Sequence, residues 1–512
     1  MRVFLIIALV FQSLFSGEPP ARSLQSIYTS LDPTSIFQHF AFYELYPDTA
    51  LGKQALRHAW ELLHEKQGSQ QILPTIDIQP LIQFVNRNPD AQSFPSLDEK
   101  QLQVIEGISR HLKNRRLKGF GVWDVEEMKR LPENEVDLAR ALFLAEMEED
   151  TAEGRLKIRT YEAHIDLMAL QILARLPENA SSEEMIRVMN EMLFNEMRFR
   201  FPPQSLGIKE VDLYTVLPSV LDSRRGVCLG VSIIYLCLAQ RLDLNLEVIT
   251  PPGHIYVRYV DPKTGEVINI ETTARGVNLP SETYLGVETR KLQQRTIREV
   301  VGMAFMNRAA VSWHRGESAA TVKLYERAAQ FLSKDDYLLN MFLGFNYLFA
   351  GREKEGKALL RKVRGVIPDY AITSDTVSED FLNGKTNAEG IQAIFQEVDE
   401  TRSSILKKQK RIEGVLKKYP KFRQGILHLA ITYLQLGREK EALPHLQRYS
   451  EIDPKDPTAQ YYLAAIQMQR FNFNEAWKHL RKAEEILSEF DHHPRALKDL
   501  RKNLQRSCPE PK

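Results

Sequence analysis

The chain has 512 residues, of which 43% are hydrophobic and 26% are charged, and its mean hydropathy is −0.33. At ~100 to 200 residues per domain, this length predicts about three domains. The composition excludes a polytopic membrane protein, a collagen-like fibre and a wholly disordered chain. Lysine and arginine number 68 against 67 acidic residues, a net charge of +1, so no global field favours nucleic acid or an anionic membrane.

The first residues have the layout of a secretory signal. Met1 and Arg2 give a positive end, the apolar run 3–15 follows, and Ser16 and Gly17 are small. The run is too short for a comfortable transmembrane helix. We expect a signal peptide or an uncleaved N-terminal anchor over residues 1–20, with a buried strand as the alternative. Export to the periplasm or the medium is therefore expected, and a cytoplasmic location if the segment is not a signal.

Residues 24–178 are expected to form a helical N-terminal region, in which no chemical motif is evident. Apolar residues recur there at a spacing of three to four, which is typical of helices. The clearest segments are 55–63, 102–112, 136–147 and 161–172.

A change of pattern after Pro177 predicts a separate domain over residues 180–300. A capped helix is expected at 182–197, and the nearly all-apolar segment 229–242 predicts a helix that is packed on most of its sides. Three strands follow from their β-branched residues and the turns between them, at 246–250, 255–260 and 267–272. A helix that leads into an antiparallel sheet indicates an α+β fold.

The C-terminal third, residues 303–490, repeats with a period of 34. Aligning Arg423 with Pro457 brings Ala430/Ala464, Ala442/Ala476 and Leu446/Leu480 into register. The pattern resembles tetratricopeptide repeats, which form an α-solenoid of paired helices. We expect a degenerate first repeat at 303–335, an insertion at about 369–402 where the register is lost, and a tail at 491–512.

The concave face of such an array commonly binds a protein or a peptide, and this is the partner we expect. Residues 401–450 also carry a basic cluster, for which a solvated face is the simpler interpretation and an acidic partner the alternative. Because no aromatic residues interleave the cluster, a nucleic-acid partner is not expected. No membrane contact is expected beyond the N-terminal segment. The basic residues are Lys407, Lys408, Lys410, Arg411, Lys417, Lys418, Lys421 and Arg423.

Cys228 is the candidate nucleophile, because it begins the apolar helix predicted at 229–242. Unpaired amides and the dipole at a helix N-terminus stabilise a thiolate, and Arg224 and Arg225 act in the same direction. Taken alone, a buried cysteine is more often a small core residue. Cys237 would lie ~13 Å further along the helix at a rise of ~1.5 Å per residue, beyond disulfide reach. With Cys508 the cysteine total is odd, so at least one free thiol is expected.

His254 is the candidate base, because it follows a Pro-Pro-Gly turn at the mouth of a strand. A lone histidine there is more often an ordinary surface residue. Strand alternation puts His254 on the same face as Asn269 and Glu271 of the next strand. A four-residue loop at 261–264 would pair Tyr256 with Asn269 and His254 with Glu271, close enough for a hydrogen bond. Glu271 is therefore expected to orient the imidazole, with Asn269 as the reserve candidate.

Several segments resemble the transglutaminase-like domain of SirB-type bacterial proteins, which join this domain to C-terminal tetratricopeptide repeats. The segments are 190–196, 217–221, 224–228, 252–254 and 269–276. The resemblance implies a papain-like core in which Cys228 is the nucleophile, His254 is the base and Glu271 stands where the family usually has Asp. Contact between Cys228 and His254 is implied by the resemblance alone.

These residues favour a cysteine-dependent acyl-transfer enzyme that hydrolyses or transamidates an amide in a protein or peptide recruited by the repeats. The alternative is a non-catalytic scaffold with a residual transglutaminase-like domain. No cofactor or metal is expected, because the chain has no His-Glu-x-x-His, no Cys-x-x-Cys, no phosphate-binding glycine loop and no dinucleotide glycine pattern.

Overall fold

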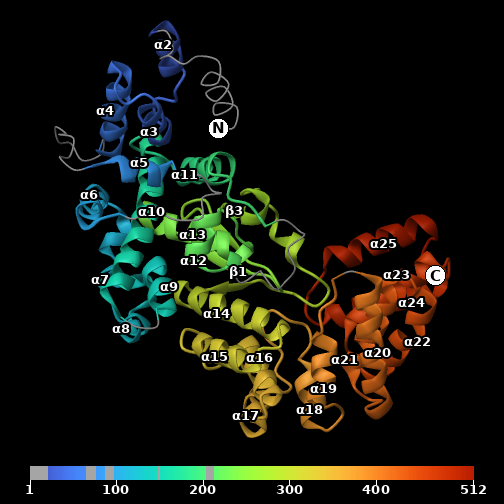
Figure 1. Ribbon diagram of the computed structural model, residues 1–512. Coiled ribbons are helices and arrows are strands. Elements are labelled where there is room, and N and C mark those ends of the chain that lie inside the picture. The colour runs from blue at the N-terminus through green and yellow to red at the C-terminus, as the bar shows by residue number, and fades with distance from the viewer. Residues whose placement is uncertain are drawn as a thin grey trace. The chain divides into compact units, whose positions relative to one another are not determined.

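The computed structural model describes residues 21–64, 77–86, 97–147, 150–202, 213–399 and 401–511 (Figure 1). The signal peptide or anchor predicted at residues 1–20 lies outside the described residues. The chain divides into two compact units. The first unit contains residues 1–202, 213–246 and 271–277, and the second contains 203–212, 247–270 and 278–512.

The first unit is helical within its described residues. Its α-helices are α2 (Ala21–Thr29), α3 (Ile36–Leu45), α4 (Ala50–His64), α5 (Gln79–Val85), α6 (Glu99–Ser109), α7 (Lys118–Gly121), α8 (Val125–Arg130), α9 (Leu138–Glu146), α10 (Ala152–Arg175), α11 (Ser182–Asn190), α12 (Leu217–Ser223) and α13 (Cys228–Leu242). Shorter turns of helix are η2 (Lys113–Arg116), η3 (Glu133–Glu135), η4 (Glu191–Glu196) and η6 (Thr272–Ala274). The four helices expected from apolar spacing are thus confirmed as parts of α4, α6, α9 and α10.

α13 is buried on nearly every side, as its composition predicts. It packs against α10, and the two helices share a buried ion pair in which Arg241 Nε donates to Asp166 Oδ1 at 2.6 Å. Arg115 donates to the other oxygen of the same carboxylate. Since an unpaired buried charge is costly, this pairing ties α13 to the N-terminal helices.

The second unit begins with a four-stranded antiparallel sheet of order β3-β2-β1-β4. Its strands are β1 (Glu247–Thr250), β2 (Tyr256–Val260), β3 (Val267–Ile270) and β4 (Gln293–Arg295). The first three strands confirm the prediction, whereas β4 was not predicted. β4 is a short edge strand of polar residues, so its sequence carries no alternation of apolar and polar positions.

The predicted pairing of β2 with β3 is wrong by two residues. Val260 pairs with Val267 and Arg258 pairs with Asn269, so Asn269 is not opposite Tyr256. The connecting loop is 261–266, two residues longer than predicted. The Asp261 carboxylate stabilises this longer turn, because it accepts hydrogen bonds from the main-chain N–H groups of residues 263 and 264 at 2.8 and 2.7 Å. A shift of two preserves the alternation of faces but removes the predicted cross-strand pair of His254 with Glu271.

The rest of the second unit is an array of helix pairs (Figure 1). α14 (Ile297–His314) packs on α15 (Ser318–Ala328), and α16 (Tyr337–Phe349) packs on α17 (Glu353–Val363). The pairs α21 (Arg423–Gln435) with α22 (Glu439–Ile452) and α23 (Pro457–Gln469) with α24 (Phe473–Ser488) follow, before the last helix, α25 (Arg495–Ser507). α21 and α23 begin at Arg423 and Pro457, the two residues whose alignment set the predicted period.

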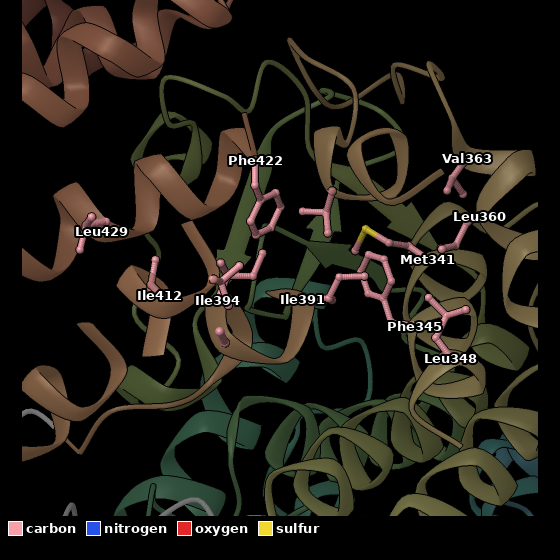
Figure 2. Close-up of a cluster of buried hydrophobic side chains, with 13 residues drawn as sticks. Met341, Phe345, Leu348, Leu360, Val363, Ile391, Ile394, Ile412, Phe422 and Leu429 are labelled. Carbon is pink, nitrogen blue, oxygen red and sulfur yellow. The ribbon is translucent and has the colours of Figure 1, made fainter. Parts of the chain in front are cut away.

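The region where the repeat register is lost, 369–402, contains two short helices, α18 (Thr376–Leu382) and α19 (Ala388–Phe395), before α20 (Arg402–Lys418). One cluster of buried side chains runs through α16, α17, α19, α20 and α21 (Figure 2). Phe345, Ile391, Ile412 and Phe422 are all fully buried in it. The hydrophobic core of the array is therefore continuous across this region.

An ion-pair network also joins α18 to α21. The Asp380 side chain is fully buried and accepts hydrogen bonds from the Arg423 amide at 2.9 Å and from Arg423 Nε at 3.0 Å. Arg423 also pairs with Glu379 and, at 3.4 Å, with Asp453. Arg423, the last member of the predicted basic cluster, thus serves the packing of the array.

The segment that leads to β4 is bound by the helical array. Ile372 N donates to Glu288 O at 3.1 Å, and Arg290 N donates to Tyr370 O at 2.9 Å. The Glu288 carboxylate accepts the Thr458 hydroxyl of α23 at 2.5 Å, and burial raises the pKa of this carboxyl group. The sheet and the array of the second unit are therefore joined by main-chain contacts at residues 288 and 290 and by the Glu288 side chain.

Candidate functional site

Cys228 is the first residue of α13, and its side chain is half-buried. Val227 is the N-cap, with an extended backbone, and contributes no side-chain hydrogen bond to the helix end. The amides of the first helical turn lack partners within the helix, so they favour negative charge on a group placed there. The position is therefore suited to a thiolate nucleophile.

Main-chain contacts fix the segment that precedes Cys228. Val227 N donates to Tyr214 O at 3.1 Å, and Gly226 N donates to Arg200 O at 3.1 Å. Gly230, the third residue of α13, has no side chain where Tyr214 O approaches; a Cβ atom there would lie 2.2 Å from that oxygen. The backbone around Tyr214 therefore lies directly against the first turn of α13.

The other two cysteines have different surroundings. Cys237 is fully buried in α13, and burial raises the pKa of its thiol. Cys508 is half-buried near the C-terminus, where its carbonyl oxygen accepts the Trp477 indole N–H at 3.0 Å. All three thiols are free, as the odd count predicts for at least one of them. Of the two cysteines in α13, only Cys228 is accessible to solvent.

Glu271 lies in the same unit as Cys228. It is buried, with 4% of its surface exposed, and it caps η6 by accepting the Thr273 amide at 3.0 Å and the Thr273 hydroxyl at 2.5 Å on Oε1. The hydroxyl of its neighbour Thr272 lies 3.0 Å from that of Ser232, which is one turn along α13 from Cys228. The turn that carries Glu271 is thus attached to the helix that carries Cys228.

Asn190 makes a second attachment between this turn and α13. Its Oδ1 accepts the hydroxyl of Tyr235 at 3.0 Å, and its Nδ2 donates to Gly276 O at 3.4 Å. Gly276 has a φ of +78°, and a Cβ atom there would lie 2.4 Å from the Asn190 side chain. Sequence reasoning placed Asn190 in the family resemblance but assigned no contact to it, because residues 190, 235 and 276 are far apart in the chain.

His254 and Asn269 lie in the second unit. His254 is half-buried and lies two residues before Tyr256, the first residue of β2, and its ring stacks on that of Tyr284 with centroids 5.8 Å apart. Asn269 is a buried residue of β3. The main chain of Glu271, the residue predicted opposite His254 across the ladder, forms an isolated bridge with Val277 of its own unit. Tyr284, at the end of η7 (Ser281–Tyr284), was missed because no periodic pattern marks this loop.

The described residues include no group of three His, Cys, Asp or Glu side chains that is arranged to hold a metal ion. A membrane-spanning helix is likewise absent from the described part of the chain, where no helix combines sufficient length with sufficient apolarity.

Comparison with family models places residues 159–304 in a known group. This segment, which includes α13, Glu271 and the whole sheet, matches the model of the transglutaminase-like superfamily. Residues 159–304 form a transglutaminase-like domain. No curated protein matches the chain.

Solved structures similar to the chain include MamA of MSR-1, with 16% identity over 37% of this chain and 97% of the other and a TM-score of 0.20. The TPR2AB domain of yeast Sti1 in complex with pHSP90 has 18% identity, with coverages of 40% and 85% and a TM-score of 0.21. TTC0263, a thermophilic TPR protein of Thermus thermophilus, has 15% identity, coverages of 40% and 98% and a TM-score of 0.21. At these scores the likeness carries no argument about this chain.

Proposed function

We propose that the protein is a cysteine-dependent acyl-transfer enzyme that acts on an amide of a protein or peptide. The observation that carries the proposal is the half-exposed thiol of Cys228 at the first turn of α13, within a transglutaminase-like domain. His254 is the proposed base, on the resemblance to SirB-type proteins described above. Glu271 is proposed to orient the imidazole, in the role that the family usually gives to Asp.

The proposed reaction has two steps. The Cys228 thiolate attacks the carbonyl carbon of the amide; a C–S bond forms, the C–N bond breaks, and protonated His254 gives its proton to the departing amine. Water or a primary amine then attacks the thioester carbonyl carbon and passes a proton to His254; a C–O or C–N bond forms, and the C–S bond breaks, which releases the Cys228 thiolate. We propose the Cys228 amide N–H as one donor to the oxyanion that forms in each step.

Contacts within the first unit support the role of Glu271. The Thr273 amide and hydroxyl both bind Oε1, which fixes the orientation of the carboxylate. The hydrogen bond between Thr272 and Ser232 fixes the position of its turn on α13. A carboxylate that orients a catalytic imidazole must itself be held in place; here Thr273 holds one carboxylate oxygen, and Thr272 holds the turn that carries it.

Acylation by an activated ester tests the proposal without knowledge of the natural substrate. The full chain is incubated with p-nitrophenyl acetate, and the site of acetylation is located by mass spectrometry. We expect a hydroxylamine-sensitive adduct on Cys228 that is absent from Cys228→Ser and present in the matched variant Cys237→Ser. Acetylation of Cys228 no faster than that of Cys508 would instead support the scaffold function.

The scaffold function has one specific observation in its favour, the array of helix pairs that follows the domain, in which α21 and α23 begin at Arg423 and Pro457, one 34-residue tetratricopeptide period apart. Such arrays commonly bind proteins or peptides, and we propose that this one binds the protein that the domain acts on.

We also propose export, on the pattern of residues 1–17. N-terminal sequencing of the mature protein tests this, with a new N-terminus expected just after the apolar run.

A further inference from the structure

The His254 imidazole has an aromatic side chain against its face. The Tyr284 ring stacks on the His254 ring with an angle of 20° between the ring planes. The same Tyr284 ring stacks on Tyr256, with centroids 4.6 Å apart and an angle of 19°. Tyr256 is fully buried in β2, so it is a fixed support. The imidazole therefore lies against a ring that is itself held by the core of the sheet.

A stacked contact of this kind restrains the plane of an imidazole while leaving its edge accessible. Rotation about the bond that joins the ring to its Cβ would break the near-parallel contact with Tyr284. The two ring nitrogens lie on the edge of the imidazole, so stacking does not compete with their hydrogen bonds. A base in nucleophilic catalysis needs this combination, because proton transfer requires the nitrogen at a defined angle and distance.

The loop that carries Tyr284 is in turn held by Asn269. The Asn269 amide group donates through Nδ2 to Leu279 O at 2.7 Å and to Ser281 Oγ at 3.1 Å. The Asn269 main-chain N–H donates to Asn278 Oδ1 at 3.0 Å. Asn269 is only 3% exposed, so these hydrogen bonds form in a dry environment where they are strong. Residues 278–281 are thus bound to β3 through the side chain and the main-chain N–H of one residue, Asn269.

The position of Asn269 excludes direct contact with the imidazole. Asn269 lies opposite Arg258, which is four residues beyond His254 in an extended segment. At ~3.3 Å per residue, that separation is on the order of 13 Å along the strand. The contacts that connect Asn269 to His254 run through the loop and Tyr284.

We propose that Tyr284 is the positioning residue of the His254 imidazole and that Asn269 acts through it. The inference rests on the proposed function, since it concerns the base of that reaction. It replaces the expectation that Asn269 is a direct reserve partner of the histidine.

The test compares Tyr284→Leu, which removes the ring, with Tyr284→Phe, which keeps it. In protein carrying labelled histidine, we expect the NMR resonances of His254 to report one ring-nitrogen environment in the unsubstituted protein and in Tyr284→Phe, and an averaged environment in Tyr284→Leu. The acetylation rate of Cys228 is expected to fall roughly tenfold to a hundredfold in Tyr284→Leu, with an altered pH profile, and to recover in Tyr284→Phe.

The two readouts separate the inference from the proposed function. If Cys228 acetylation proves independent of His254, the proposed function fails, while the His254 resonances still decide whether Tyr284 positions the ring. Resonances and pH profile unchanged in Tyr284→Leu overturn the inference. If Tyr284→Leu does not fold, Ser281→Ala removes one acceptor of the Asn269 amide; broadened His254 resonances in that variant support the inference, and unchanged ones overturn it.

Discussion

The segment that leads into Cys228 and the segment that leads into His254 are held by different kinds of contact. Before Cys228, main-chain hydrogen bonds link residues 200, 214, 226 and 227, and Gly230 lets the backbone at Tyr214 approach α13 directly. Around His254, the His254 N–H donates to Pro251 O at 3.1 Å, and the ring itself stacks on Tyr284, whose loop is bound by the side-chain amide of Asn269. The Cys228 segment is held by contacts to a distant part of the backbone, whereas the His254 ring is held by side chains.

This difference predicts how the two segments respond to substitution. A backbone contact cannot be repacked by rotating a side chain, so a substitution that obstructs it should be costly in stability. A stacked ring can be lost while the sheet stays folded, so its loss should affect the chemistry more than the stability.

Gly230→Ala is expected to have the largest effect on stability. The new Cβ atom would lie 2.2 Å from Tyr214 O, a main-chain atom, so we expect the free energy of unfolding to fall by about 3 kcal/mol or more. The measurement is urea unfolding of the full chain, followed by circular dichroism.

Gly107→Ala is the matched control, because Gly107 is an exposed glycine of α6 and a Cβ atom there would have no other atom within 4 Å. Replacing a helical glycine by alanine in open space should raise stability by ~0.5 to 1 kcal/mol. Equal unfolding curves for Gly230→Ala and the unsubstituted protein would contradict the main-chain account of the Cys228 segment.

Gly276→Ala is expected to have a smaller effect that depends on Asn190. Alanine at a φ of +78° is strained by about 1 kcal/mol, and its Cβ would also clash with the Asn190 side chain. Asn190→Ala alone should cost ~1 to 3 kcal/mol, because the buried Tyr235 hydroxyl loses its acceptor. In the double variant, Gly276→Ala should add only the strain.

Gly316→Ala is the control for the strain, since Gly316 has a φ of +80° and open space around it. We expect its cost to equal the cost of Gly276→Ala measured in the Asn190→Ala background. Strictly additive costs for the Gly276→Ala and Asn190→Ala changes would show that Asn190 does not fill the space beside Gly276.

Much of the fold was accessible from the sequence because it follows from periodic burial. The all-apolar run of α13, the strands β1 to β3 and the repeat period that begins α21 and α23 all depend on which residues must be buried. The faces of β2 and β3 were also predicted correctly, because a two-residue alternation survives a shift of two.

The contacts that sequence reasoning could not reach depend on loop geometry. The length of the loop at 261–266 is set by hydrogen bonds to the Asp261 carboxylate, and no periodicity reports it. The predicted register, in which His254 lies directly opposite Glu271 across the ladder, was wrong for that reason. The contacts of Tyr284 and Asn190 likewise join segments that only the folded chain brings together, so one sequence could not have shown them.

The central claim is that Cys228 is a nucleophile activated by His254. The rate at which Cys228 reacts with iodoacetamide at neutral pH tests this claim most directly, with Cys508 as the internal reference. The account predicts that Cys228 reacts much faster than Cys508 and that His254→Ala abolishes the difference, while buried Cys237 stays unmodified. Equal rates at Cys228 and Cys508, unchanged by His254→Ala, would contradict it.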